Sequence, residues 1–193
     1  MAKRKTDFMP DPQGTGILSK LYMTYQQRMT ILRWALYTIT CLVLLVAQDV
    51  LLCDLKLFGG SVNLAVSMLL LVCAMQDLET AAVFALVGSC VYLFSDAAPG
   101  PYVIVMLTVL GVAEAAFRQS FLRRSFGSSV LCAGVCLVVY EALLFGIGLF
   151  AQLTRIGRFW AFLGTTIQSL VALPLLYPLF AAIGKIGGKT WIE

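Results

Sequence analysis

Long apolar stretches follow one another along most of the chain. The first comprises residues 31–53 and is interrupted only by Arg33 at its start and by Gln48 and Asp49 near its end. As a helix with a rise of about 1.5 Å per residue, it would extend about 34 Å, enough to cross the hydrocarbon layer of a bilayer. Of the 193 residues, 60% are hydrophobic and only 12% are charged. This pattern predicts an all-α integral membrane protein, because a soluble domain cannot cover so much apolar surface.

Two of the apolar stretches are too short for a simple crossing. The chain has six apolar stretches in all, which predict a bundle of six transmembrane helices in one membrane domain, residues 29–187. The stretches 62–75 and 81–94 would extend only about 21 Å each as helices. They form either tilted helices shielded by their neighbours or one re-entrant hairpin, which requires that protein covers its backbone. The five stretches after the first are 62–75, 81–94, 102–117, 129–153 and 159–183.

The segments outside the membrane domain are polar and orient it. Residues 1–28 predict a cytoplasmic N-terminal tail and an amphipathic helix at the membrane interface, and residues 188–193 predict a short cytoplasmic tail. In the six-helix topology, eleven of the 14 lysines and arginines fall on one side and three on the other. Basic residues flank membrane helices on the cytoplasmic side, so both termini are predicted to be cytoplasmic. A re-entrant hairpin would give the same orientation, so charge does not separate the two alternatives.

Few residues suit catalysis or metal binding. The chain has no histidine, which removes the usual general base near neutral pH and the commonest metal ligand. The six cysteines lie mostly in apolar stretches without a CxxC spacing, which predicts packing rather than a zinc site or a disulfide framework. Asp49, Asp54 and Asp96 are predicted at the outer surface, where they would anchor turns or, as paired carboxylates, act as acid and base. No nucleophile motif accompanies them, so we expect a protein that is not an enzyme, holds no cofactor or metal and binds no nucleic acid.

Glu141 is the clearest polar residue inside a predicted transmembrane helix. It lies near the middle of the stretch 129–153, where the side chain cannot easily reach either interface. Two interpretations remain open: a polar contact that fixes assembly with another helix or a partner protein, or a protonated carboxyl hydrogen-bonded within its own bundle, for instance to Gln168. Glu114, by contrast, lies one turn before Arg118, which predicts an ordinary ion pair at the cytoplasmic interface.

Small residues and prolines predict how the helices pack. Ala81 with Ala85, and Gly111 with Ala115, have the four-residue spacing that lets helix backbones approach closely. Two prolines, the first of them Pro174, remove backbone donors from the last predicted helix. They should bend or loosen that helix, which would either shape a groove or accommodate packing.

Several local features, taken in order over residues 31–187, resemble the MreD family of rod shape-determining proteins. None of these features is a catalytic signature, and their joint order carries the resemblance. They are Asp54 and Leu55 after the first helix; Phe94, Ser95 and Asp96 at the end of the third, before a turn with Pro99 and Gly100; Glu141 and the residues up to Ile147 in the fifth; and Leu173 with Pro174 in the sixth.

This resemblance implies a non-enzymatic scaffold of the cell-elongation complex in a bacterial plasma membrane. The fold would be similar to the substrate-binding (S) components of energy-coupling-factor vitamin transporters. Surrounded by membrane lipid, the scaffold would bind MreC in a hetero-oligomer and link MreB filaments to the peptidoglycan synthases, RodA and its transpeptidase partner. Residues expected to serve structure or partner contact are Asp54, Asp96, Pro99, Gly100, Glu141, Gln168 and Pro174.

The alternative function is that of such a transporter S component itself. It would have nearly the same size and number of helices. S components tend to carry an AxxxA pair on the first helix, where they dock their energy-coupling partner, and residues 35–47 contain none. The scaffold is therefore the preferred interpretation.

Overall fold

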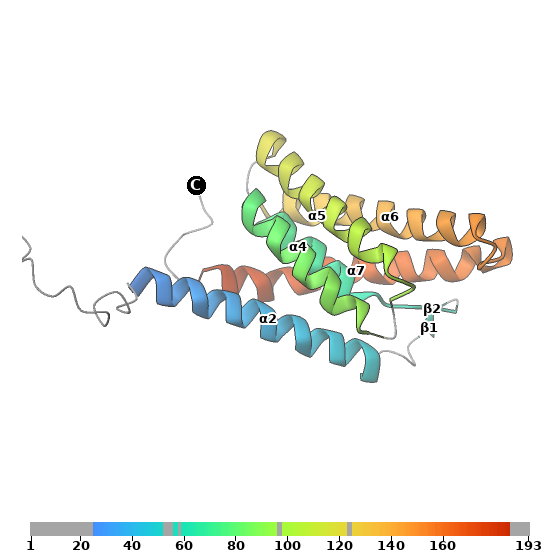
Figure 1. The fold of residues 1–193 in the computed structure, drawn as a ribbon, viewed down its shortest axis with the longest axis horizontal. Helices are drawn as coiled ribbons and strands as arrows, with labels where there is room; N and C mark the ends of the chain where they lie inside the picture. Colours follow the sequence, from blue (N-terminus) through green and yellow to red (C-terminus); the bar gives the residue numbers. More distant parts are fainter. Residues whose placement is uncertain (1–24, 52–55, 58, 96–97, 123–124, 186–193) are drawn as a thin grey trace, which may run out of the picture.

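The structure is a computed structural model that describes residues 25–51, 56–57, 59–95, 98–122 and 125–185. Within these ranges the chain forms six α-helices, a two-stranded antiparallel hairpin and one 3-10 turn (Figure 1). The elements are α2 (Tyr25–Leu51), β1 (Lys56–Leu57), β2 (Gly60–Ser61), α3 (Leu64–Met75), α4 (Leu78–Leu93), α5 (Tyr102–Phe121), α6 (Phe126–Phe150), η1 (Ile156–Arg158) and α7 (Phe159–Gly184).

Four segments of the described chain are long and apolar enough to cross a membrane, namely Arg28–Val50, Tyr102–Phe121, Phe126–Phe150 and Ile156–Gly184. Large apolar side chains on them are exposed, among them Val43, Leu131 and Leu175. An exposed apolar helix surface is expected where lipid rather than water is the solvent. The prediction of a helical, multi-pass membrane protein is confirmed at the level of these four segments.

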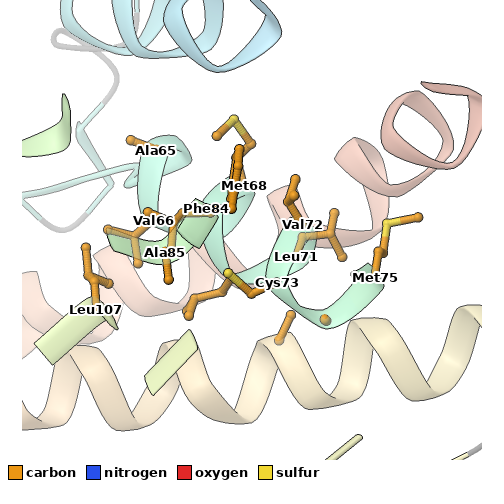
Figure 2. Packing of buried hydrophobic residues seen from close by; sticks show 14 of the residues in the cluster. Ala65, Val66, Met68, Leu71, Val72, Cys73, Met75, Phe84, Ala85 and Leu107 are labelled. Atoms are coloured by element: carbon orange, nitrogen blue, oxygen red, sulfur yellow. The ribbon is translucent and has the colours of Figure 1, made fainter. Parts of the chain in front are cut away.

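The two short apolar helices are α3, with 12 residues, and α4, with 16. The shorter one, α3, lies at the centre of the bundle and contacts α2, α4, α5, α6 and α7. Every residue of α3 after Leu64 is buried, and Figure 2 shows Met68, Leu71 and Val72 among the packed side chains. Neighbouring helices therefore shield α3 on all sides, which is the condition under which a short apolar segment is tolerated at membrane depth.

Successive helices run in alternating directions along the bundle (Figure 1). One end, named here the hairpin end, holds β1 and β2, the start of α3, the end of α4, the start of α5 and the connection from α6 to α7. The opposite end holds the start of α2, the turns from α3 to α4 and from α5 to α6, and the end of α7. The described chain therefore begins and ends at the same end of the bundle, as an even number of crossings would require.

The first described helix extends across the predicted start of the membrane domain. The helix α2 begins at Tyr25 and continues without a break to Leu51. The predicted interfacial helix and the first transmembrane helix are continuous here, and the candidate span begins at Arg28, so the boundary at residue 29 stays a prediction. Residues 1–24 and 188–193, which carry the predicted tails, lie outside the described residues.

Local sequence explains where several elements begin. The side chain of Asn63 caps the start of α3, and Ser125 with Ser128 forms a reciprocal capping box at the start of α6. Such side chains satisfy helix N–H groups that have no partner within the helix. In the hairpin turn, Gly59 has a φ of +85°, a left-handed conformation that glycine adopts without steric cost. The hairpin itself was not predicted from the sequence.

Small residues allow α4 and α5 to approach closely. Ala81 and Ala85 on α4, and Gly111 and Ala115 on α5, are all buried. A Cβ atom on Gly111 would lie only 2.9 Å from Cβ of Ala85. The predicted role of these residues in close helix packing is confirmed.

We expect Gly111→Ala to lower the free energy of unfolding by about 1 to 3 kcal/mol, because the added methyl group overpacks the contact with Ala85 and Cys73. Thermal unfolding in detergent measures the effect. Gly146→Ala is the matched control, because a Cβ atom there would meet nothing within 4 Å. Helix propensity alone should leave that variant as stable as the wild type or up to about 1 kcal/mol more stable. Equal losses in the two variants would contradict the close packing of α4 and α5.

Candidate functional site

Glu141 lies buried in α6, with 6% of its surface exposed. Its Oε1 accepts a hydrogen bond from Nδ2 of Asn63 at 3.3 Å. The backbone N–H of Asn63 donates to Oγ of Ser169 at 2.9 Å, and Oγ of Ser67 donates to the backbone oxygen of Asn63 at 2.9 Å. These four residues, named here the Asn63 cluster, join α3, α6 and α7 at the hairpin end.

A side chain from α2 also reaches the start of α3. Oε1 of the buried Gln48 accepts a hydrogen bond from the backbone N–H of Ala65 at 2.9 Å. Gln48 and Asn63 thus satisfy helix-end N–H groups that would otherwise be unpaired in an apolar surrounding. In the sequence, Gln48 stands out only as an interruption of the first apolar stretch, and Asn63 does not stand out at all. Both are polar residues that flank the connection to a short apolar helix, and this position could have indicated that they bind the end of that helix.

Gln168 is not the partner of Glu141. Its Oε1 is buried without a hydrogen-bond partner among the described residues, whereas the carboxyl group of Glu141 binds Asn63. Glu141 is hydrogen-bonded within its own bundle, as one of the two interpretations has it, but the partner is Asn63 and not the Gln168 suggested as an example. The physical reason is that the N-cap of α3 enters between α6 and α7 and takes the position that sequence reasoning assigned to the neighbouring long helix.

A cleft of about 480 Å³ opens beside Glu141 at the hairpin end. Its walls come from the hairpin, the start of α5, the last turns of α6 and the start of α7, and Pro99 is the other predicted site residue that lines it. The hairpin rests directly on α7: a Cβ atom on Gly60 would collide with the backbone oxygen of Ala161 and lie 2.7 Å from the backbone nitrogen of Thr165. Only glycine allows this contact.

The cleft is lined by aromatic and charged side chains as well as by Glu141. Tyr102, Phe145 and Phe162 contribute to its walls, and the rings of Phe145 and Phe162 stack with a centroid separation of 5.1 Å and an interplanar angle of 27°. Arg158, which is exposed, also lines the cleft. The site therefore combines one buried carboxyl group, aromatic rings and one exposed cation.

The other predicted site residues are not all brought to this cleft. Gly100 adjoins Pro99, and its backbone oxygen accepts a hydrogen bond from the N–H of Val103 at 3.2 Å in the first turn of α5. Pro174 is exposed on α7, away from the residues that line the cleft. Asp54 and Asp96 lie outside the described residues.

A second polar cluster lies at the opposite end, where α3 ends. Nη2 of Arg118 donates to the backbone oxygen of Gln76 at 2.9 Å. Glu114 is 1% exposed and Arg118 is 2% exposed, and neither carboxyl oxygen of Glu114 has a hydrogen-bond partner in the described part of the chain. The two residues are buried rather than exposed as an ordinary surface pair would be, because α3, α4 and α6 pack around this face of α5. Whether this end of the bundle faces the cytoplasm stays a prediction.

The described thiols and carboxyl groups form no recognisable metal centre. In the described ranges, no group of three or more His, Cys, Asp or Glu residues is placed to hold a metal ion. Cys132 donates a weak hydrogen bond through Sγ to the backbone oxygen of Glu114 at 3.9 Å. The described cysteines are free thiols, and Cys41, Cys73 and Cys132 are buried.

No protein-family model, curated protein or solved structure matches this chain. The fold defines a multi-pass helical membrane protein, and the site adds a partly polar cleft at one end of the bundle. Its function must therefore be inferred from the cleft and from the local sequence features around it.

We expect Asn63→Ala to lower the free energy of unfolding by about 1 to 3 kcal/mol, because it leaves the buried Glu141 without a donor and α3 without its cap. Gln168→Leu is the control: it removes a buried oxygen that has no partner and should leave stability unchanged or higher. Thermal unfolding in detergent compares the two variants. The double variant Asn63→Ala, Glu141→Leu should lose less than the sum of its single variants. Strict additivity would argue against direct contact between the two side chains.

Proposed function

We propose that this protein is a non-enzymatic membrane scaffold of the MreD kind. In this proposal it binds MreC in a bacterial plasma membrane and thereby links MreB filaments to RodA and its transpeptidase partner. All six helices, α3 and α4 included, cross the bilayer with both termini in the cytoplasm. The bundle is similar in fold to the S components of energy-coupling-factor transporters.

The observation that carries this proposal is that residues from two of the MreD-like segments meet at one cleft. Pro99, from the turn before α5, lines the cleft together with Glu141 and Phe145 of α6. A further wall is the hairpin that follows Asp54 and Leu55 in the sequence. Segments far apart in the chain thus contribute to one surface, as expected if they serve a common partner contact.

Burial of Glu141 supports a role in assembly. A carboxyl group at membrane depth costs free energy unless it is well paired, and among the described residues one neutral amide donates to it. A partner that supplies a further donor or a positive charge would offset part of this cost. Fully desolvated polar anchors of this kind often contribute much of the affinity of an interface.

We expect Glu141→Leu to weaken co-purification of MreC by about tenfold or more, which corresponds to about 1.4 kcal/mol of binding free energy. Quantitative pull-down from membranes with equal expression measures this. Glu79→Leu is the control, because Glu79 is an exposed carboxylate at the opposite end of the bundle. Thermal unfolding of Glu141→Leu confirms that the variant is folded. Unchanged recovery of MreC with the folded variant would reject the proposed role of Glu141.

We expect an impermeant maleimide to label Gly157→Cys but not Ser120→Cys in intact cells, because the excess of basic residues predicts that the opposite end of the bundle is cytoplasmic. Both positions are exposed. Permeabilised cells provide the control, in which both variants should be labelled. Labelling of Ser120→Cys from outside would reverse the proposed orientation.

The same assay separates six crossings from a re-entrant hairpin. In permeabilised cells, Glu79→Cys, next to the turn between α3 and α4, should react about as fast as Ser120→Cys if that turn reaches the cytoplasmic water. A turn that stops inside the bilayer would leave Glu79→Cys largely unreactive, and α3 with α4 would then form a re-entrant hairpin.

The cleft itself favours a second candidate function, that of a transporter S component. Its volume of about 480 Å³ is in the usual range for sites that bind small molecules. Mass spectrometry of the material that co-purifies with the protein discriminates between the two. Recovery of energy-coupling subunits and a bound vitamin, without MreC, would favour the transporter.

A further inference from the structure

Glu141 has no charged partner in the described structure. Oε1 accepts a long hydrogen bond from the neutral amide of Asn63, and Oε2 accepts none from any described residue. Arg158 lines the same cleft, yet no hydrogen bond or ion pair joins it to Glu141 within the described ranges. A nearly buried carboxyl group without a charged partner ionises only at a cost in free energy, and a bound cation would stabilise its charged form.

The walls of the cleft suit an organic cation. Tyr102, Phe145 and Phe162 all line the cavity that Glu141 reaches. The faces of aromatic rings carry partial negative charge and attract ammonium and guanidinium groups, most strongly where water is excluded. A carboxylate together with several aromatic rings is the combination by which proteins recognise alkylammonium groups, whereas an anion would meet repulsion from both.

Arg158 does not cancel this preference. It is exposed just before α7, where water and salt screen its charge. Glu141 lies nine residues before Phe150 at the end of α6, which places it about 13 Å deeper along the helix axis. Screening is weaker at that depth, so the carboxylate dominates the potential at the bottom of the cleft while Arg158 acts at its mouth.

We propose that the cleft binds an organic cation, an ammonium or guanidinium group that lies against Glu141 and the rings of Tyr102, Phe145 and Phe162. Either a basic side chain of a partner protein or a small amine presents this chemistry. The inference rests on the proposed function only in taking the cleft as a binding site, and it deepens that function by naming the chemical class of the ligand.

The test compares a cationic and an anionic thiol reagent at one reporter position in the cleft. Ser61→Cys is a conservative change at an exposed residue that lines the cleft. It is made in a Cys53→Ser background, so that the thiol of Cys53, which lies outside the described residues, does not contribute to the measured rate. The reagents are the trimethylammonium-ethyl and sulfonato-ethyl methanethiosulfonates, each rate being normalised to the rate with free mercaptoethanol. The purified full-length protein in detergent is used.

We expect the cationic reagent to react about tenfold faster than the anionic one, and Glu141→Gln to bring this ratio close to one, because a nearby carboxylate acts on the two reagents with opposite sign. Glu79→Gln, which removes an exposed carboxylate at the opposite end, should leave the ratio unchanged. Arg158→Gln should raise it. A ratio near one in the Ser61→Cys protein with Glu141 intact would overturn the proposal.

A second measurement keeps the proposal testable if Glu141→Gln does not fold. Tetramethylammonium chloride should slow the cationic labelling of Ser61→Cys several-fold relative to sodium chloride at the same ionic strength. Equal rates in the two salts would also overturn the proposal.

Labelling in membranes distinguishes the sources of the cation. If Ser61→Cys is protected from the cationic reagent only when the partner protein is co-expressed, the cation is a basic side chain of that partner. If Ser61→Cys is protected without that partner, and the protection is lost on washing and restored by adding back the wash fraction, the cation is a small amine. If the labelling is cation-selective but no MreC co-purifies with the protein, this inference stands and the proposed scaffold function is rejected. The two proposals can therefore be tested independently.

Discussion

The architecture depends on satisfying the two ends of α3, a short apolar helix enclosed by other helices. Helix ends carry backbone groups without intrahelical partners, and an apolar bundle offers no water to bind them. At the first end, Gln48 and Asn63 accept hydrogen bonds from backbone N–H groups. At the other end, Arg118 donates to the backbone oxygen of Gln76. The buried polar clusters at both ends of the bundle are therefore consequences of where α3 begins and stops.

This requirement also explains the position of the candidate site. The cap of α3 holds Glu141 through Asn63, and the hairpin that precedes α3 rests on α7 through Gly60. The same elements form part of the wall of the cleft. Stability and a binding surface thus share residues, so variants such as Glu141→Leu need a stability measurement beside every binding measurement. The polar clusters are separated by the apolar body of the bundle, and only the cluster with Glu141 adjoins the cleft described here.

Sequence reasoning succeeded where structure follows from local pattern. The apolar stretches predicted the long helices α5, α6 and α7 to within a few residues, and the spacing of Ala81, Ala85, Gly111 and Ala115 predicted a close helix contact. It failed where a contact joins distant segments. The pairing of Glu141 with Gln168 was inferred from two long helices, whereas Asn63 comes from a connection whose path the pattern does not specify. The burial of Glu114 and Arg118 was missed because a charge pair near a helix end ordinarily faces water.

The sequence by itself determined that the chain is a helical membrane protein, because apolar stretches of this length can satisfy their backbone groups among lipid tails only as helices. It also determined that the polar residues inside those stretches would need partners. Only the tertiary structure decided which partners they have and that Glu141, the hairpin and the aromatic rings share one cleft. These contacts depend on how short helices are enclosed and how loops enter between long ones, and hydrophobic pattern carries no information about that arrangement.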